Sequence, residues 1–281
     1  MKICKTIADL RSYRRSAECG KLIFIPTMGA LHEGHGSLIQ MARKIAGKHG
    51  IVITSIFVNP TQFGPHEDFH KYPRPFKLDL AHLTRWNADV VFAPSPEEMY
   101  PAGSTITINP GPLGEVLEGA VRPGHFRGVA TVVAKLLNLV QPAVMILGQK
   151  DFQQQLILRR MVADLNMPVE IITAPTIREP DGLAMSSRNR YLSVPQRACA
   201  SAIYQALTAA SDQYHRGQRD AATLQSAMYT LISQAGMEVQ YALACHAETL
   251  TPFSGLISRP AVLLVAAKLG TTRLIDNMLL A

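Results

Sequence analysis

Short β-branched runs alternate with helical patterns along the chain up to about residue 176. Strands are predicted at 21–25, 51–58, 89–93, 144–147 and 169–173, and helices at 35–49, 76–86, 128–140 and 152–165. The 51–58 run has no polar alternation, which is typical of a strand covered on both faces in a parallel sheet. This β–α–β rhythm predicts a doubly wound α/β domain.

A different pattern follows residue 176. The polar loop 178-REPDGLAMSSRNR-190 leads into 193-SVPQ-196, which has the spacing of a capping box with proline in the first helical turn. A long helix to about residue 215, a helix near 220–234 and β-like runs at 239–245 and 261–267 come next. We therefore expect two domains, residues 1–176 and a smaller α+β domain over residues 177–281.

The composition is that of a globular protein with a basic balance. The chain is 47% hydrophobic and 17% charged, and 28 Lys and Arg against 21 Asp and Glu give a net charge of +7. Such a charge is compatible with an ordinary basic soluble enzyme, and it is also compatible with an anionic partner such as ATP, phosphate or nucleic acid. The nearest thing to a dense basic block is 11-RSYRR-15, which a solvated helix face explains, so nucleic acid is not expected as a partner.

The cysteines indicate the compartment. Cys4, Cys19, Cys199 and Cys245 lie far apart, with no CxxC pair, which disfavours a disulfide framework or a zinc knuckle and fits a reducing cytosol. Charged residues near the N-terminus interrupt any signal-peptide core. The apolar run 261-AVLLVAA-267 is too short to span a bilayer. We expect a soluble, cytoplasmic protein without a membrane partner.

The stretch 21-KLIFIPTMGALHEGHGSLIQMARK-44 places His32 and His35 where a predicted strand turns into a helix. In open α/β sheets ligands bind outside the carboxyl ends of the strands. A helix N-terminus favours an anion, and Gly29 and Gly34 let the backbone approach it. Imidazole N–H groups can donate to phosphate oxygens as charge develops at phosphorus. The two histidines are therefore interpreted as a clamp for a nucleotide phosphate.

Two other interpretations of this turn stay open. Histidines at i and i+3 can both bind a metal, although a catalytic zinc needs a third protein ligand and HEGH lacks the HExxH spacing. Alternatively, either histidine alone can serve only to cap the helix.

The turn and several further motifs together resemble a known family. These motifs are 26-PTMGALHEGH-35, 56-IFVNPTQF-63, 72-YPR-74, 117-LEG-119, 122-RPGHFRGV-129, 148-GQKDFQQ-154, 185-MSSRN-189 and 273-RLIDN-277. In this order they resemble the pantothenate synthetase (pantoate–β-alanine ligase) family of the nucleotidylyltransferase superfamily. The first motif is similar to the HIGH motif of that superfamily.

The resemblance implies an activity and a fold. It implies a ligase of pantothenate and coenzyme A biosynthesis that condenses (R)-pantoate with β-alanine to pantothenate, AMP and diphosphate through pantoyl adenylate. ATP would be the co-substrate, with Mg²⁺ riding mainly on its phosphates. It further implies a Rossmann-like sheet in an ATP- and pantoate-binding domain, a C-terminal lid domain, and a homodimer.

The resemblance also assigns residues, each matched to a motif. ATP binding falls to Met28, Gly29, Ala30, Leu31, His32, Glu33, Gly34, His35, Gly148, Gln149, Lys150, Asp151, Ile177, Met185, Ser186, Ser187 and Arg188. Among these, catalytic roles fall to His32, His35, Lys150 and Arg188. His35 resembles the family's usual proton donor. We expect it to stabilise the transition state instead, because phosphoryl attack by a carboxylate releases no proton.

The remaining roles are more local. Gln62 and Gln154 match the amides that bind pantoate, and an amide offers both a donor and an acceptor to a hydroxy acid. Asn59 is expected to hold the same loop. Asp151 matches the ribose-binding carboxylate, and a helix N-cap is the alternative. The 185–188 stretch is similar to the mobile KMSKS loop at the domain junction of the superfamily.

Some positions depart from the family or stay unassigned. Gln149 stands where the family usually has Glu, which removes a charge beside Lys150. Asp79 is the only acid in 75-PFKLD-79, so no magnesium ligand is assigned and the metal site is unknown. Sequence reasoning does not place Glu118, Arg122 and His125 at the chemistry.

Three other functions compete with the ligase interpretation. One is another adenylyl- or cytidylyltransferase of the same fold, which would make no amide. Another is a tRNA synthetase fragment, which predicts salt-sensitive tRNA binding. The third is a non-catalytic ATP-binding regulator, which would bind ATP without turnover.

Overall fold

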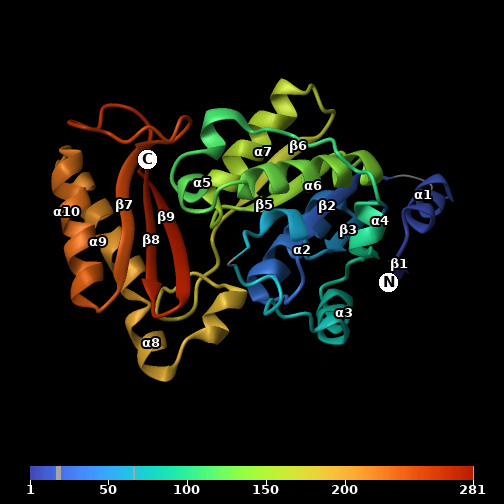
Figure 1. The fold of residues 1–281 in the computed structure, drawn as a ribbon, viewed down its shortest axis with the longest axis horizontal. Helices are drawn as coiled ribbons and strands as arrows, with labels where there is room; N and C mark the ends of the chain where they lie inside the picture. Colours follow the sequence, from blue (N-terminus) through green and yellow to red (C-terminus); the bar gives the residue numbers. More distant parts are fainter. Residues whose placement is uncertain (17–19, 66, 281) are drawn as a thin grey trace. The chain divides into compact units, whose positions relative to one another are not determined.

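The computed structural model describes residues 1–16, 20–65 and 67–280, so Cys19 lies outside the described residues. The chain divides into two compact units (Figure 1). The first comprises Met1–Gly148 and Gln153–Ala174, and the second comprises Gln149–Phe152 and Pro175–Ala281.

The first unit is built on a six-stranded sheet with the order β1-β4-β3-β2-β5-β6, in which every pairing is parallel. The strands are β1 Lys2–Cys4, β2 Leu22–Thr27, β3 Ile51–Ile56, β4 Val90–Phe92, β5 Val144–Gly148 and β6 Glu170–Ala174. The α-helices are α1 Ile7–Ser16, α2 Glu33–Ala46, α3 Phe76–Arg85, α4 Pro96–Met99, α5 Glu118–Val121, α6 His125–Val140 and α7 Phe152–Asp164. The 3-10 turns are η1 Pro60–Gln62 and η2 Gly111–Gly114.

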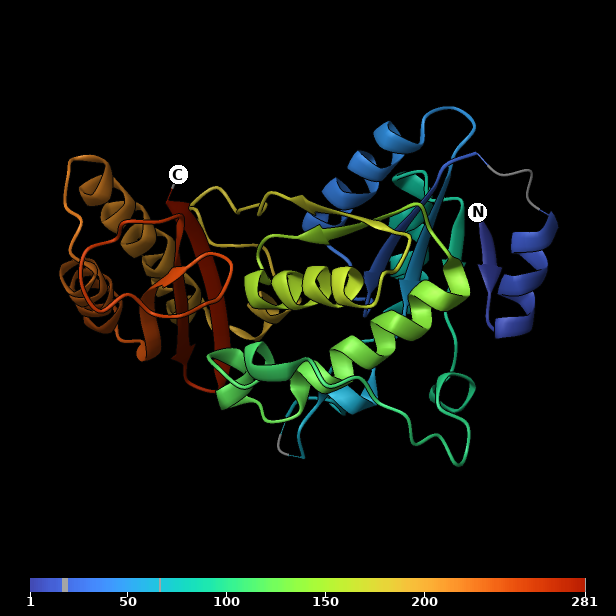
Figure 2. The same cartoon turned by 90° about the horizontal axis from the view of Figure 1, so that it is seen from above.

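Helices cover both faces of this sheet, as Figure 2 shows for α2 on one side and α6 and α7 on the other. Successive side chains of a strand point to opposite faces. Ile23 and Ile25 of β2 accordingly pack in a core with α2 and α3, while Phe24 packs in a second core with α1, α6 and α7. The predicted Rossmann-like, doubly wound fold is therefore confirmed.

The second unit contains a three-stranded antiparallel sheet with the order β7-β8-β9. Its elements are η3 Ser187–Tyr191, α8 Val194–Cys199, α9 Ala202–His215, α10 Ala221–Gln234, β7 Glu238–His246, β8 Ala261–Leu269 and β9 Thr272–Leu280. Leu207 of α9 and Met228 of α10 share a core with Leu263 and Val265 of β8. The smaller α+β architecture is thus also confirmed.

The local signals in this unit have mixed outcomes. Ser193 caps α8 through the predicted capping box with Gln196. The single long helix expected to residue 215 is wrong, because α8 ends at Cys199 and α9 begins at Ala202. Strand β9 was not predicted. No helix within residues 1–16, 20–65 and 67–280 is long and apolar enough to cross a membrane.

Candidate active site

Strands β2 and β5 mark the point where the order of the first sheet reverses. They pair with each other, and the chain continues from β2 to β3 on one side and from β5 to β6 on the other. Ligands of open α/β sheets bind at the carboxyl ends of strands at such a point. β2 ends at Thr27 and leads into the histidine turn, and β5 ends at Gly148 and leads into the Lys150 segment.

A buried carboxylate holds the backbone of the histidine turn. Asp79, only 1% exposed, accepts the Ala30 N–H through Oδ2 at 2.9 Å and the Leu31 N–H through Oδ1 at 2.8 Å. Ala30 has a positive φ of 51°, and Gly29 has a φ of 81° with Asp79 and Ile56 too close for a Cβ. The sequence pattern suggests Asp79 only as an acid near a metal and does not predict its contact with this turn.

His32 and His35 cap α2 together. The Gly34 N–H donates to His32 Nδ1 at 3.2 Å, the His32 N–H donates to His35 Nδ1 at 3.3 Å, and the ring centroids are 4.2 Å apart. Both rings therefore take part in capping the helix. Because each Nδ1 accepts an N–H, each neutral ring carries its proton on Nε2, which makes Nε2 a donor.

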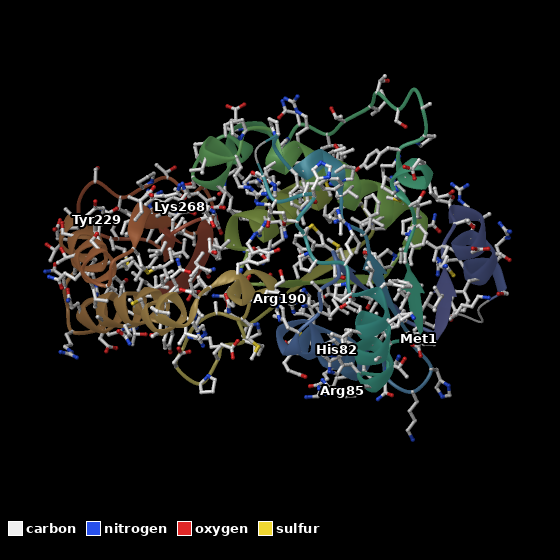
Figure 3. The ribbon with its side chains drawn as sticks, turned by 60° about the horizontal axis from the view of Figure 1, so that its bottom comes forward. Met1, His82, Arg85, Arg190, Tyr229 and Lys268 are labelled. Atoms are coloured by element: carbon white, nitrogen blue, oxygen red, sulfur yellow. The ribbon has the colours of Figure 1, made fainter. Side chains whose placement is uncertain are left out.

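The other residues of this turn have structural partners too. Glu33 forms an ion pair with Arg85. Arg85 is the last residue of α3 and is labelled in Figure 3. Both side chains are more than half exposed, so the pair contributes little to stability. Met28 accepts a contact from Gln62, whose Nε2 lies 3.1 Å from the Met28 sulfur. The turn and the predicted pantoate-binding amide are thus adjacent.

Asn59 holds Gln62 in place, as expected. Its Nδ2 donates to Gln62 Oε1 and to the Gly128 carbonyl oxygen, both at 3.1 Å, and the Tyr100 hydroxyl donates to its Oδ1 at 2.9 Å. Asn59 and Gln62 are both buried. A Cβ on Gly128 would lie 2.3 Å from the Thr61 carbonyl oxygen, so only glycine allows α6 to approach this loop.

A partly buried cluster of Glu67, Arg122 and His125 supports Gln62 from its backbone side. Arg122 donates from Nε and Nη2 to the two oxygens of Glu67 at 2.7 and 2.6 Å, and its Nη1 lies 3.0 Å from His125 Nε2. An arginine only donates, so His125 Nε2 accepts and its Nδ1–H donates to the Gln62 carbonyl oxygen at 2.8 Å. Burial, and secondarily the charge of Arg122, lowers the pKa of His125 to about 4. The sequence pattern does not predict that Arg122 and His125 contact the Gln62 loop.

The first unit also contains Glu118 and Gln154. The Glu118 N–H donates to Gln153 Oε1 at 3.0 Å, and Gln153 Nε2 donates to the carbonyl oxygens of Leu113 and Val116 at 2.8 Å, so Gln153 ties the 113–118 loop to α7. Gln154 is half-buried near the start of α7.

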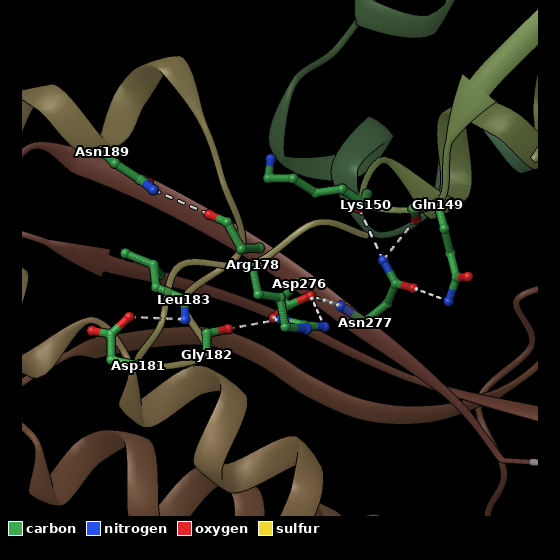
Figure 4. Close-up of polar contacts among 10 residues, drawn as sticks. Gln149, Lys150, Arg178, Asp181, Gly182, Leu183, Asn189, Asp276 and Asn277 are labelled. Carbon is green, nitrogen blue, oxygen red and sulfur yellow. Dashed lines mark hydrogen bonds and ion pairs between the residues drawn. The ribbon is translucent and has the colours of Figure 1, made fainter. Parts of the chain in front are cut away.

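Gly148 belongs to the first unit, and the predicted ATP-binding residues from Gln149 onward lie in the second unit. Asn277 holds the carbonyl oxygens of Gln149 and Lys150 (Figure 4). The Met185 N–H donates to the Ile177 carbonyl oxygen at 3.0 Å. Ser186 caps η3 by accepting the Arg188 N–H at 3.2 Å, which starts the turn that carries Ser187 and Arg188.

The donor sets do not form a protein-held metal site. Within the described residues, no group of three or more His, Cys, Asp or Glu side chains is arranged to hold a metal ion. Both oxygens of Asp79 already accept backbone N–H groups.

The fold and the turn define the chain as a two-domain α/β protein of the Rossmann-like class, with a capped histidine turn at the switch point of its sheet. The model of the pantoate-beta-alanine ligase family matches residues 2–279. The chain therefore belongs to the pantoate–β-alanine ligase family.

Individual relatives agree with this assignment. The pantothenate synthetase of Chloroflexus aurantiacus is 49% identical over 100% of this chain and 98% of its own length. The pantothenate synthetase structure from Thermus thermophilus matches with a TM-score of 0.93 and 44% identity over 99% of both chains. The pantoate-beta-alanine ligase of Francisella tularensis, solved with beta-gamma ATP and beta-alanine, matches with a TM-score of 0.82 and 36% identity over 99% of this chain and 97% of that one.

Proposed function

We propose that this protein condenses pantoate with β-alanine at the expense of ATP, giving pantothenate, AMP and diphosphate. The observation that carries the proposal is the family match over residues 2–279. The two Nε2 donors at the switch point of the sheet supply a physical basis for phosphate binding there.

The reaction runs in two steps that need no covalent enzyme intermediate. A carboxylate oxygen of pantoate attacks the α-phosphorus of ATP, a new P–O bond forms, and diphosphate leaves. The β-alanine amine then attacks the acyl carbon of pantoyl adenylate, the acyl C–O bond to AMP breaks, and the amine loses a proton. Positioning and charge stabilisation therefore supply the catalysis.

The first unit binds ATP and pantoate in this proposal. His32 and His35 donate from Nε2 to phosphate oxygens as negative charge builds up on them. Because the first step releases no proton, we assign both histidines to charge stabilisation rather than proton transfer. Gln62 and Gln154 offer amide donors and acceptors to the hydroxyl and carboxylate groups of pantoate.

The second unit acts as the lid. Lys150 and Arg188 neutralise the phosphates and the leaving diphosphate, and the hydroxyls of Ser186 and Ser187 donate to the same oxygens. The Ile177 backbone contacts adenine, and Asp151 binds the ribose hydroxyls. The remaining ATP contacts come from the backbone of residues 28–31, 33–34, 148–149 and 185.

Magnesium and assembly follow from the family resemblance alone. Mg²⁺ enters as the counter-ion of ATP and keeps mainly phosphate and water ligands, so no step is assigned to a protein-held metal. We expect a homodimer in the cytoplasm that binds small molecules and no nucleic acid.

The test is AMP formation from ATP and D-pantoate, with and without β-alanine, at fixed magnesium. We expect steady turnover to AMP and pantothenate only when both acids are present. Folded protein that binds ATP but makes no AMP under either condition would refute the ligase.

A further inference from the structure

The second unit contains two segments that contact phosphate in the proposed function, and these segments lie far apart in the sequence. The Lys150 segment follows β5, and the segment with Ser187 and Arg188 follows the loop at 177–185. Strand β9 carries Asp276 and Asn277 side by side (Figure 4). Asn277 contacts the Lys150 segment, and Asp276 contacts Arg178 in the loop that leads to Ser187 and Arg188. Side chains of neighbouring strand residues point to opposite faces, which lets one short stretch of strand reach both.

Asn277 fixes the two peptide groups that flank Lys150. Its Nδ2 donates to the Gln149 and Lys150 carbonyl oxygens, each at 2.9 Å, and its Oδ1 accepts from Gln149 Nε2 at 3.3 Å. Carbonyl oxygens only accept, so the two backbone contacts set which way the Asn277 amide faces. The Gln149 side-chain amide supplies the donor that this orientation requires. The side chain of Lys150 therefore starts from a fixed backbone position.

Asp276 fixes the loop that leads to Arg188. Arg178 donates to its two carboxylate oxygens at 2.5 and 3.1 Å, and the Asn277 N–H donates to Oδ1 at 2.8 Å. The Asp276 side chain is 3% exposed and that of Arg178 is 19% exposed, so water screens this pair little.

Arg178 also contacts other residues of the loop directly. Its Nη1 donates to the Gly182 carbonyl oxygen at 3.1 Å, and its guanidinium lies 4.3 Å from the centre of the Tyr204 ring. Arg178 also pairs in a β-bridge with Ala184, next to Met185. The segment that enters η3 is thus tied to β9 through one guanidinium.

We propose that Asp276 and Asn277 are positioning residues of the ligase. Asn277 fixes the backbone position from which the Lys150 side chain extends. Asp276, acting through Arg178, fixes the position of the loop that leads to Arg188. This inference rests on the proposed function, because it takes Lys150 and Arg188 to contact the phosphates. Misplacing a catalytic group by about 1 Å can lower a rate by about 10²-fold. The positioning role therefore predicts a loss in kcat rather than in pantoate binding.

The experiment uses two near-isosteric changes and one control in the full-length protein. Asn277→Asp replaces two N–H donors by an oxygen that faces two carbonyl oxygens. Arg178→Lys keeps the charge and loses the two-pronged contact with Asp276. Gln240→Ala is the control, because it removes a side-chain hydrogen bond to Arg273 in the same small sheet without touching either segment.

The readout separates positioning from folding. For each variant we would measure Tm, the dissociation constant of D-pantoate, and, well below Tm, kcat for diphosphate release with ATP, pantoate and β-alanine all present. We expect Asn277→Asp and Arg178→Lys to lower kcat by roughly 10- to 100-fold, with pantoate affinity within about twofold of the wild type. Gln240→Ala should match the wild type in both constants.

Each outcome decides between the two proposals. Wild-type protein that makes no AMP overturns the proposed function, whatever the variants do. Active wild type together with folded variants that keep the control's kcat overturns the positioning role and leaves the ligase intact. If Asn277→Asp does not fold, Arg178→Lys decides the question. If neither folds, the contacts are structural and the positioning role is overturned.

Discussion

The Nδ1 atom of His35 accepts the backbone N–H of His32 at 3.3 Å, so the ring that closes the first turn of α2 keeps its proton on Nε2. Helix capping and phosphate binding therefore do not exclude each other in this turn. Capping uses one nitrogen of each imidazole and orients the other as a donor. The two roles can be separated by substitution.

His35→Ala should lower the rate of adenylation by on the order of 10²–10³, since it removes one transition-state donor. Gln places its amide nitrogen near the position of Nε2, whereas Asn places its amide oxygen near the position of Nδ1. We therefore expect His35→Gln to retain more diphosphate release than His35→Asn. The exposed His49 supplies the control, His49→Ala, which should behave as the wild type. Higher activity in the Asn variant than in the Gln variant would mean that capping alone matters.

The Asp79→Asn variant tests whether the contacts of Asp79 with the histidine turn matter for adenylation. The amide can accept only one of the Ala30 and Leu31 N–H groups, and the other is left buried without its acceptor, which costs about 1–3 kcal/mol. We expect both a lower free energy of unfolding and a kcat for adenylation that is at least about tenfold lower.

Asp89→Asn is the matched control for this change. Asp89 accepts the Val52 N–H at 2.8 Å, but at the amino end of β4, away from the switch-point turn. The Asp89→Asn variant should have a lower free energy of unfolding and an unchanged kcat. Equal losses of kcat in the two variants would show that the effect of Asp79 is general rather than specific to the turn.

His125 makes the stability of the protein depend on pH. The unfolded chain takes up this proton near the ordinary pKa of 6.5, while the native state takes it up only near pH 4. Between these values the unfolded state binds more protons, so acidification from pH 6.5 to 4 should destabilise the native state by up to about 3 kcal/mol.

Urea unfolding of the wild type and of His125→Gln across this pH range checks the prediction. Glutamine can place its amide oxygen near the position of Nε2 and still accept from Arg122, but it does not titrate. The difference in unfolding free energy between the two proteins should shift in favour of the variant as the pH falls. A difference that stays constant with pH would contradict a buried neutral imidazole at this position.

Lys150→Ala should lower adenylation by on the order of 10²–10³ while the fold persists. Lys150→Arg keeps the charge but changes its geometry, so an intermediate rate is expected. Lys268→Ala serves as the control, because Lys268 (Figure 3) makes a partly exposed ion pair with Glu238 at 3.7 Å. Wild-type rates in folded Lys150→Ala would remove Lys150 from the chemistry.

The apolar periodicity predicted most of the fold. Strands β2 to β6 are short runs of β-branched and aliphatic residues between helical patterns, and each lies within a few residues of its predicted range. Strand β9 is not predicted from the sequence because Asp276 and Asn277 interrupt its apolar pattern. Both are buried polar residues with partners elsewhere in the chain. The break between α8 and α9 escaped because Ala200 and Ser201 keep helical dihedral angles and give no stop signal.

The candidate site was predictable where its parts are close in sequence. The glycines and histidines of the turn lie together, and so their placement at a strand end followed from the local pattern. The contact from Asp79 to Ala30 spans 49 residues, and that from His125 to Gln62 spans 63. Contacts of this kind depend on the pairing of distant elements, which periodicity does not encode.

The most direct test of the central claim, that ATP activates pantoate at its α-phosphorus, follows the oxygen atoms of pantoate. D-pantoate labelled with ¹⁸O in its carboxylate would be converted with ATP and β-alanine, and the phosphorus products analysed by mass spectrometry. Because one carboxylate oxygen stays on phosphorus when the acyl C–O bond breaks, we predict one ¹⁸O in AMP and none in diphosphate. Label in inorganic phosphate, with ADP as the nucleotide product, would contradict the adenylate route.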